Sequence, residues 1–254
     1  MDAELKNYWD HSSENYNHII HDELKSFRTK AWQNIILKNA PQKVKMDVLD
    51  VGTGPGFFAV ILSKKGHRVT AIDASPEMLH KAKINAEQYR VDVQFHLVEG
   101  SELAFEDSSF DLIVSRNVTW ALTEPIMAYK EWLRILRPGG RVLIFDANWH
   151  HHRFDSQLAE EMRWREQQCI EIYGSTFSDD TGHRQMNVEY LPLTRVMRPE
   201  WDKNILNILE YVNISTEENI IENLWDDKEK LLYGATPLFM IKAEKMGEKA
   251  VSEG

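Results

Sequence analysis

The feature that most constrains the fold is a glycine-rich turn between two short apolar runs, within Met46 to Ala74. The first run enters the turn Gly52-Thr53-Gly54-Pro55-Gly56, and a helical pattern follows from Phe57 to Lys65. Arg68 to Ile72 has the pattern of a second buried strand, with Asp73 at its carboxyl end. Strand, glycine turn, helix and strand form the unit that binds ligands beyond the carboxyl edge of a doubly wound sheet.

Each glycine has a physical role in such a unit. Gly52 permits the tight turn, Gly54 lets the backbone approach a ligand, and Gly56 lets helix and strand pack closely. Asp73 follows Gly52 by 21 residues, which places its carboxylate to accept hydrogen bonds from both hydroxyls of a ribose. The sequence therefore predicts a nucleoside site.

The turn is unsuited to a pyrophosphate. The dinucleotide fingerprint has a third glycine three positions after the second, where this chain has Phe57. Pro55 also removes a backbone N–H at the point where a phosphate would bind. These two residues disfavour a dinucleotide oxidoreductase and favour a nucleoside without phosphates.

The segment VLDVGTGPG, together with Asp73, resembles motif I and the following acid of the class I S-adenosylmethionine-dependent methyltransferases. The loop after Val98, the Phe110-Asp111 strand start and the LRPGG segment before a fifth strand, Arg141 to Ala147, extend the resemblance through Ala147. It implies S-adenosyl-L-methionine as cofactor and S-adenosyl-L-homocysteine as product. It also implies an α/β fold with a Rossmann-like, doubly wound, seven-stranded, mostly parallel sheet. Its last strand, predicted at Pro237 to Ala243, would run antiparallel between the fifth strand and a sixth at Tyr211 to Ser215, with residues 238–241 in that position.

The resemblance also assigns roles to single residues. Asp50 would help to hold the methionine end of the cofactor, and Glu99 would accept a hydrogen bond from the adenine amino group. Trp9 and Tyr16 resemble an aromatic pattern with which N-terminal segments of the family cover the cofactor. The full predicted cofactor set is Trp9, Tyr16, Asp50, Gly52, Thr53, Gly54, Gly56, Asp73, Ala74, Met78, Glu99, Gly100, Ser101, Arg116 and Asn117.

Four regions follow from this organisation. Residues 1–40 are predicted to be a helical N-terminal lid, or alternatively an amphipathic helical pair packed beside the sheet. Residues 41–147 form the cofactor-binding core, and residues 148–198 form an inserted helical cap or substrate region. Residues 199–254 supply the C-terminal part of the core sheet and a charged tail.

Composition limits the partners. The formal charge of −10 disfavours a nucleic-acid partner, which normally needs a basic face. Cys169 is the single cysteine, which excludes a disulfide framework within one chain and fits a reducing compartment. No apolar run is long enough to cross a membrane, and the N-terminus has no signal-peptide pattern. We expect a cytoplasmic monomer or homodimer.

The expected chemistry requires alignment more than reactive side chains. The cofactor's methyl group is already electrophilic, so a base is needed only when the acceptor atom arrives protonated. Weak candidates for a catalytic role are His11, Asn117 and His151, although His150 to His152 also fit an exposed polar loop. Adjacent histidines lack the ligand spacing of a metal site, so no metal is expected.

The acceptor is predicted by elimination. Trp120, Trp149, Trp164 and Trp201 could form an aromatic cage for a cationic or flat substrate, or simply pack in the core. The segment Ser115 to Val118 lacks the Asn/Asp-Pro-Pro-aromatic sequence of the family's nucleic-acid amino methyltransferases. One cysteine excludes the mechanism of the arsenic-methylating relatives. A small-molecule acceptor leads; a protein or RNA methyltransferase, and a cofactor-binding protein that uses the pocket for other chemistry, stay as alternatives.

Overall fold

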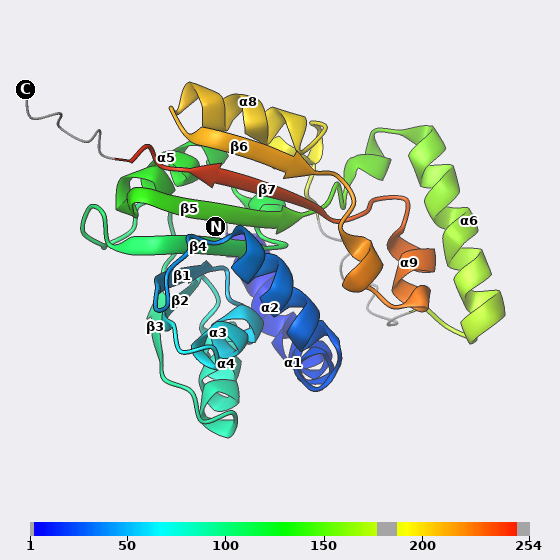
Figure 1. The fold of residues 1–254 in the computed structure, drawn as a ribbon. Coiled ribbons are helices and arrows are strands. Elements are labelled where there is room, and N and C mark those ends of the chain that lie inside the picture. Colours follow the sequence, from blue (N-terminus) through cyan, green and yellow to red (C-terminus); the bar gives the residue numbers. More distant parts are fainter. Residues whose placement is uncertain (1–2, 177–186, 248–254) are drawn as a thin grey trace, which may run out of the picture.

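In the computed structural model, which describes residues 3–176 and 187–247, the chain is built on one seven-stranded sheet (Figure 1). The strand order is β3-β2-β1-β4-β5-β7-β6. Only β7 runs antiparallel to its neighbours, β5 and β6, which confirms the predicted fold class. The strands are β1 Asp47–Val51, β2 Arg68–Asp73, β3 Val93–Leu97, β4 Phe110–Arg116, β5 Leu136–Asp146, β6 Val212–Glu217 and β7 Phe239–Glu244.

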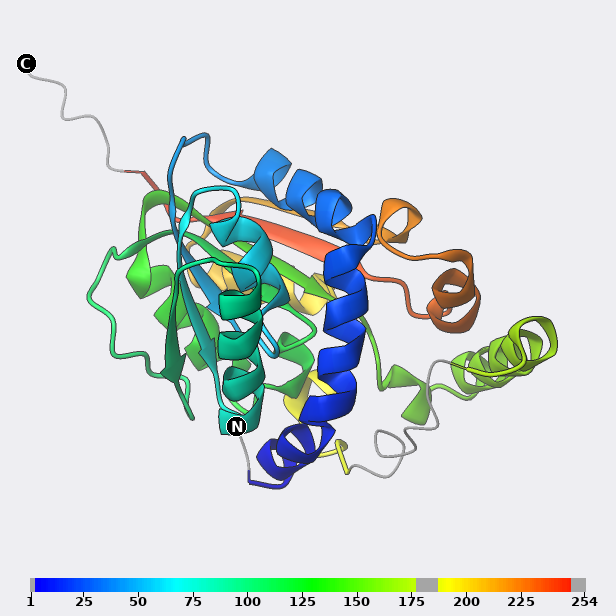
Figure 2. The same ribbon diagram turned by 90° about the horizontal axis from the view of Figure 1, so that it is seen from below.

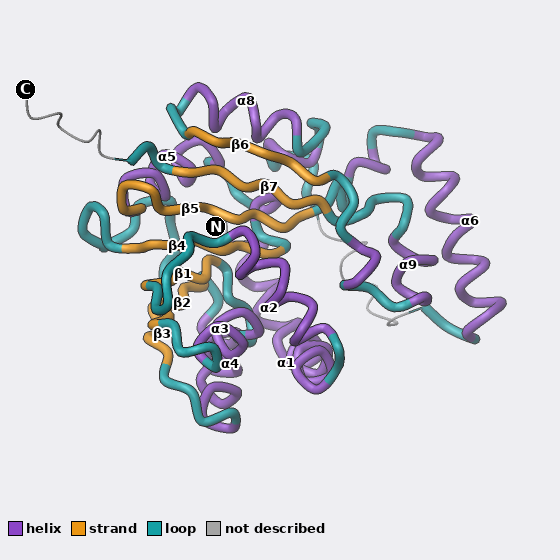
Figure 3. The backbone as a smooth tube through the Cα atoms, in the orientation of Figure 1, coloured by secondary structure: helices purple, strands orange, loops and turns teal. Residues whose placement is uncertain are grey.

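The central strands are buried on both faces. Successive side chains alternate between two cores, as Val48 and Leu49 do on β1 and as Leu112 and Ile113 do on β4. All four of these side chains are fully buried, which explains why both strands are rich in apolar residues. The helices therefore lie on both sides of the sheet (Figure 3).

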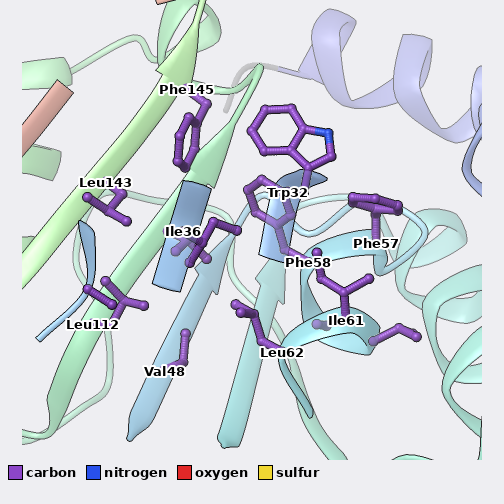
Figure 4. Close-up of a cluster of buried hydrophobic side chains, with 14 of the residues drawn as sticks. Trp32, Ile36, Val48, Phe57, Phe58, Ile61, Leu62, Leu112, Leu143 and Phe145 are labelled. Atoms are coloured by element: carbon purple, nitrogen blue, oxygen red, sulfur yellow. The ribbon is translucent and has the colours of Figure 1, made fainter. Parts of the chain in front are cut away.

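One face is covered by α2 (Arg28–Asn39) and α3 (Phe57–Ser63). Here Trp32 meets Phe58 and Phe145 edge to face, with ring centroids 5.1 Å apart in both pairs (Figure 4). Such pairs add specific geometry to the burial of large apolar surfaces. This core fixes the helix that follows the glycine turn.

The opposite face is covered by α5 (Pro125–Ile135) and α8 (Glu200–Ile208). Tyr129 and Trp132 of α5 are buried against β5 and β7, and Leu206 of α8 joins them. The two helix layers and the sheet make a three-layer α/β/α arrangement.

Of the remaining helices, α4 (Pro76–Gln88) packs beside α3 against β2 and β3, and the others lie at the carboxyl edge of the sheet or beyond it. The helix α1 (Ala3–Lys25) packs against α4, while α6 (Ser156–Tyr173) packs against α9 (Asp227–Tyr233). Figures 1 and 2 show α1 on the side toward which β4 and β5 point, with α6 farther out. Short 3-10 turns are η1 Thr119–Ala121, η2 His151–Arg153, η3 Pro192–Thr194 and η4 Ile221–Asn223.

Some predicted element bounds were wrong. The fifth strand was expected at Arg141 to Ala147, but β5 begins at Leu136, where it pairs with Phe110 before the register shifts. Gly139, with φ +73°, lets the strand bend there instead of ending in a loop. The sixth strand was expected at Tyr211 to Ser215 and extends from Val212 to Glu217. Residues 177–186 of the predicted cap and 248–254 of the predicted tail lie outside the described residues.

Candidate active site

A cavity of about 120 Å³ lies at the carboxyl edge of the sheet, between the glycine turn and α1. Many of the predicted cofactor residues line it. They are Trp9, Tyr16, Gly52, Gly54, Asp73, Ala74, Met78, Gly100, Ser101, Arg116 and Asn117. Four predicted residues, Asp50, Thr53, Gly56 and Glu99, are not part of its lining.

Two of the three glycines in the turn have a neighbour too close for a side chain. Gly52 has φ +65°, and a Cβ there would lie 2.3 Å from Cγ2 of Val118. Gly56 has φ +91°, and a Cβ there would lie 3.2 Å from the Cβ of Ala82 on α4. At Gly54 the nearest atom to such a Cβ would be Cε1 of Tyr16, at 3.4 Å. The turn thus requires glycine for its backbone angles and for its close neighbours.

The side chain of Asp50 holds this turn in place through hydrogen bonds. Its Oδ2 accepts hydrogen bonds from the Thr53 hydroxyl at 2.6 Å and from the Ala59 N–H at 3.0 Å. Burial raises the pKa of Asp50 to about 7, although these two hydrogen bonds lower it. Asp50 therefore positions the loop, since the residue is 2% exposed and lies outside the cavity lining.

Asp73 faces the cavity from the end of β2. Its Oδ2 accepts a hydrogen bond from the Gly54 N–H at 2.8 Å, and its Oδ1 accepts one from the Ser75 N–H at 2.9 Å. Burial raises its pKa, while these backbone donors lower it. Each carboxylate oxygen can accept a second hydrogen bond, so both stay able to bind a diol.

Glu99 lies beside the cavity without lining it. Its side chain is 57% exposed and forms an ion pair with Lys6 of α1, which lowers the pKa of the carboxyl group. The neighbouring Val98, Gly100 and Ser101 do line the cavity. The loop thus lies where the resemblance implied, with the Glu99 carboxylate directed to α1.

Two polar residues at the carboxyl end of β4, Arg116 and Asn117, face the cavity. Nη2 of Arg116 donates to Oε2 of Glu23 at 2.9 Å, and its guanidinium lies 4.7 Å from the Phe57 ring centroid. Asn117 has φ +58°, a conformation that costs energy in a non-glycine residue. Its buried Oδ1 has no hydrogen-bond partner within residues 3–176 and 187–247. Such an orphaned acceptor beside a cavity fits a ligand donor.

The roof of the cavity is α1. Asp10 Oδ1 accepts a hydrogen bond from the Ser75 hydroxyl at 2.5 Å, and Asn17 Oδ1 accepts one from Nδ2 of Asn85 at 2.9 Å. The Trp9 and Tyr16 rings lie 5.9 Å apart and both line the cavity. The helix is therefore attached to the core by polar contacts at several points along its length.

The two candidate histidines lie away from the cavity lining, whereas Asn117, the third candidate, is part of it. His11 is exposed, and its Nδ1 lies 2.6 Å from the Asn7 carbonyl oxygen on the same helix. Nδ1 of His151 is buried without a partner among the described residues. In that part of the chain, no group of three or more His, Cys, Asp or Glu side chains is placed to hold a metal.

The four tryptophans considered as a cage do not come together. Trp120 and Trp149 pack in one cluster, whereas Trp201 packs in the α8 face of the core. Trp164 is 57% exposed on α6.

Sequence reasoning missed the apolar part of the lining. Val98, Leu103, Leu122 and Trp132 form walls of the cavity, and each looks like an ordinary core residue in its element. Glu23, the partner of Arg116, was missed as well, because 93 residues separate the two.

The strand order and the glycine turn with its trailing acid define a class of protein, the class I S-adenosylmethionine-dependent methyltransferases. The family follows from comparison: residues 49–144 match the family described as "Methyltransferase domain", so this part of the chain is such a domain. The cofactor of this class is S-adenosyl-L-methionine.

Curated proteins that are similar to the chain are named as methyltransferases of different substrates. A demethylmenaquinone methyltransferase of Paenarthrobacter aurescens is 32% identical over 126 residues, which cover 50% of this chain and 48% of that protein. The chain thus spans about half the length of the curated relatives it matches.

Two solved structures share the fold. Phosphoethanolamine N-methyltransferase 2 of Haemonchus contortus, in complex with S-adenosyl-L-methionine, has a TM-score of 0.59 at 20% identity. The match covers 84% of this chain and 52% of the Haemonchus contortus chain. The cyclase SpnF has a TM-score of 0.57 at 16% identity, with 85% of this chain and 80% of that one covered. The fold is therefore shared by proteins with different chemistry.

Proposed function

We propose that the chain is an S-adenosylmethionine-dependent methyltransferase that acts on a small molecule. The observation that carries the proposal is the Asp73 carboxylate, which faces a cavity beside the glycine turn and accepts a hydrogen bond from the Gly54 N–H of that turn. The formal charge of −10 disfavours RNA as acceptor. No helix within residues 3–176 and 187–247 has the length and apolar character needed to cross a membrane. We also propose that the protein works in the cytoplasm.

The residues of the cavity fit the parts of this cofactor. Asp73 would bind the ribose hydroxyls, and the apolar wall with Val98, Leu103 and Trp132 would hold the adenine. Arg116 offers a cation for the carboxylate of the methionine end. The orphaned Oδ1 of Asn117 can accept a hydrogen bond from its ammonium group.

When bound, the cofactor supplies an electrophilic methyl group: the acceptor atom's lone pair bonds to carbon, and the carbon–sulfur pair stays on sulfur. The task of the chain is to orient and to exclude water, since alignment of reacting groups is worth roughly 7–11 kcal/mol. Trp9 and Tyr16 of α1 form one side of the cavity and would cover part of a bound cofactor from solvent. A volume of about 120 Å³ is below the roughly 300–1,000 Å³ typical of small-molecule sites, so we infer that α1 shifts outward to admit the cofactor.

Calorimetry with S-adenosylhomocysteine tests the proposal. Asp73→Ala should weaken binding by about 1–3 kcal/mol, because a charged acceptor of hydrogen bonds is lost. Glu77→Ala is the matched control, since Glu77 is an exposed acid in the first turn of α4 outside the cavity lining. An unchanged affinity in Asp73→Ala, or binding of NAD in place of S-adenosylhomocysteine, would contradict the assignment.

Binding and methyl-transfer assays with the same protein distinguish two other functions. A protein or RNA methyltransferase would show acceptor binding that weakens steeply with salt. A protein that uses the pocket for other chemistry would bind S-adenosylmethionine without transferring its methyl group to any acceptor.

A further inference from the structure

The side chain of Tyr16 lies over the glycine turn. A Cβ at Gly54 would lie 3.4 Å from Cε1 and 3.8 Å from Cδ1 of Tyr16, so one edge of the ring rests on this residue. The Gly54 N–H in turn donates to Oδ2 of Asp73 at 2.8 Å. The Tyr16 ring therefore covers the point at which the backbone of a glycine turn comes closest to its ligand.

The hydroxyl of Tyr16 is bound by two other residues of the cavity lining. Arg116 and Asn117, at the end of β4, both form hydrogen bonds with it. Burial raises the pKa of the phenol, whereas the charge of Arg116 and the two hydrogen bonds lower it. The net shift is upward, so the hydroxyl is uncharged at pH 7. An uncharged group thus occupies the two side chains that are proposed to bind the carboxylate and the ammonium group of the methionine end.

Tyr16 satisfies these two partners incompletely. Oδ1 of Asn117 is buried and has no hydrogen-bond partner within residues 3–176 and 187–247. Arg116 donates to Glu23 at 2.9 Å and, like any guanidinium, binds a carboxylate more strongly than a neutral oxygen. A ligand with both a carboxylate and an ammonium group would therefore bind these two side chains better than the Tyr16 hydroxyl does.

The cavity must enlarge to take the cofactor, and α1 is the side that can move. Its volume of about 120 Å³ compares with roughly 300–1,000 Å³ for small-molecule sites. The opposite side is fixed, because Gly52 lies against Val118 and Asp50 holds the turn. The helix α1 is attached through side-chain contacts such as the ion pair of the exposed Glu14 with Lys81, and exposed pairs contribute little.

We infer that Tyr16 occupies the position of the cofactor's methionine end, and that α1 is an autoinhibitory lid that must release this side chain before the cofactor binds. The inference rests on the proposed function. The hydroxyl competes for Arg116 and Asn117, which weakens the binding of any ligand with an amino-acid end. A ligand without that end leaves both residues to Tyr16 and meets no such competition. Once released, the ring is free to cover the bound cofactor.

The test compares two probes that share the same thioadenosine. S-adenosylhomocysteine carries the amino-acid end, and 5′-methylthioadenosine has a methyl group on sulfur in its place. Both are titrated by calorimetry at pH 7 into the full chain and into Tyr16→Phe, which loses the hydroxyl and keeps the ring on Gly54. We expect Tyr16→Phe to bind S-adenosylhomocysteine about tenfold more tightly than the wild type, and 5′-methylthioadenosine within about twofold of it.

Tyr89→Phe is the matched control. It removes a phenol hydroxyl outside the cavity lining, at the end of α4, where the Tyr89 ring lies 4.0 Å from Nζ of Lys64. Its affinity for both probes should stay within about twofold of the wild type. The two tyrosines thus separate the loss of the hydroxyl at the cavity from the loss of a phenol elsewhere.

Two outcomes would overturn the inference. If Tyr16→Phe binds S-adenosylhomocysteine as tightly as the wild type does, or more weakly, the hydroxyl does not compete with the cofactor. If Tyr16→Phe binds both probes more tightly by the same factor, the substitution only loosens α1, and Tyr16 does not occupy the place of the methionine end.

The two proposals fail separately. If neither the wild type nor Tyr16→Phe binds S-adenosylhomocysteine, the proposed function fails, and the inference fails with it. If the wild type binds S-adenosylhomocysteine and Tyr16→Phe binds it no more tightly, only the inference on Tyr16 is overturned.

Discussion

At the scale of single residues, two glycines show separately what backbone strain and steric clash would cost if a side chain were introduced. Gly52 and Gly66 both have positive φ, at +65° and +88°. A Cβ at Gly52 would collide with Val118, whereas a Cβ at Gly66 would meet nothing within 4 Å. The backbone strain is therefore similar at the two positions, and the steric clash is specific to Gly52.

We expect Gly52→Ala to lower the free energy of unfolding by about 1–3 kcal/mol more than Gly66→Ala does. The extra loss comes from overpacking against Val118. Urea denaturation of the two variants measures the difference. Equal losses would mean that the Val118 contact relaxes without cost.

At this scale the sequence was informative where chemistry is local. The glycine turn and Asp73 were predicted from spacing alone, and both lie at the cavity. The Arg116–Glu23 pair and the buried Asp146–Arg198 pair were not predictable, because their partners are distant in the chain and meet only through the fold. The assignment of Arg116 to cofactor binding stays a prediction.

Among the elements, α1 decides access to the cavity. Two of its acids form ion pairs with the core: Glu23 with Arg116, where the side chains are 15% and 10% exposed, and Glu14 with Lys81, where Glu14 is 61% exposed. Exposed pairs contribute little, whereas removal of one partner of a desolvated pair leaves an uncompensated charge.

Glu23→Gln should therefore weaken the attachment of α1 to the core, while Glu14→Gln should leave that attachment nearly unchanged. Amide hydrogen exchange across residues 3–25 measures this, with faster exchange expected only in Glu23→Gln. Exchange that is unchanged in both variants would show that apolar contacts, such as those of Ile20 and Leu24, suffice to hold the helix.

Element prediction failed where a turn signal was embedded in a strand. The Pro138-Gly139-Gly140 segment correctly predicted the end of α5 near Ile135. It did not reveal that the chain stays extended through these residues as the first part of β5. This part of β5 pairs with Lys245, whose carbonyl oxygen accepts a hydrogen bond from the Gly139 N–H at 2.9 Å. Local propensity could not show this long-range pairing.

In the whole molecule, carboxyl groups at the two edges of the sheet have opposite pKa shifts. At the amino edge, hydrogen bonds from Arg68 lower the pKa of Asp47 to about 2. At the carboxyl edge, burial raises the pKa of Asp50 to about 7. Stability from Asp47 is thus present above pH 3.8 and is lost as the pH falls through about 2.

Asp50 has the opposite effect in another pH window. The unfolded chain ionises at this residue near pH 3.8 and the folded chain near pH 7, so the free energy of unfolding falls as the pH rises between these values. Asp50→Asn should remove this dependence, by up to about 1.4 kcal/mol per pH unit.

Denaturation at pH 5, 6, 7 and 8 checks the expectation. The difference between Asp50→Asn and the wild type should grow with pH and level off above 7. For Asp47→Asn the difference should stay constant over this range, because both of its pKa values, about 2 and 3.8, lie below it. A constant difference for Asp50→Asn as well would contradict the burial argument.

The seating of Tyr16 on Gly54 has a kinetic consequence. Because α1 is proposed to shift outward to admit the cofactor, each exchange of spent for fresh cofactor would require α1 to lift and the Glu23–Arg116 contact to part. Raising the cofactor concentration would then speed loading only up to a ceiling. The maximal turnover rate would then be limited by the rate at which α1 opens.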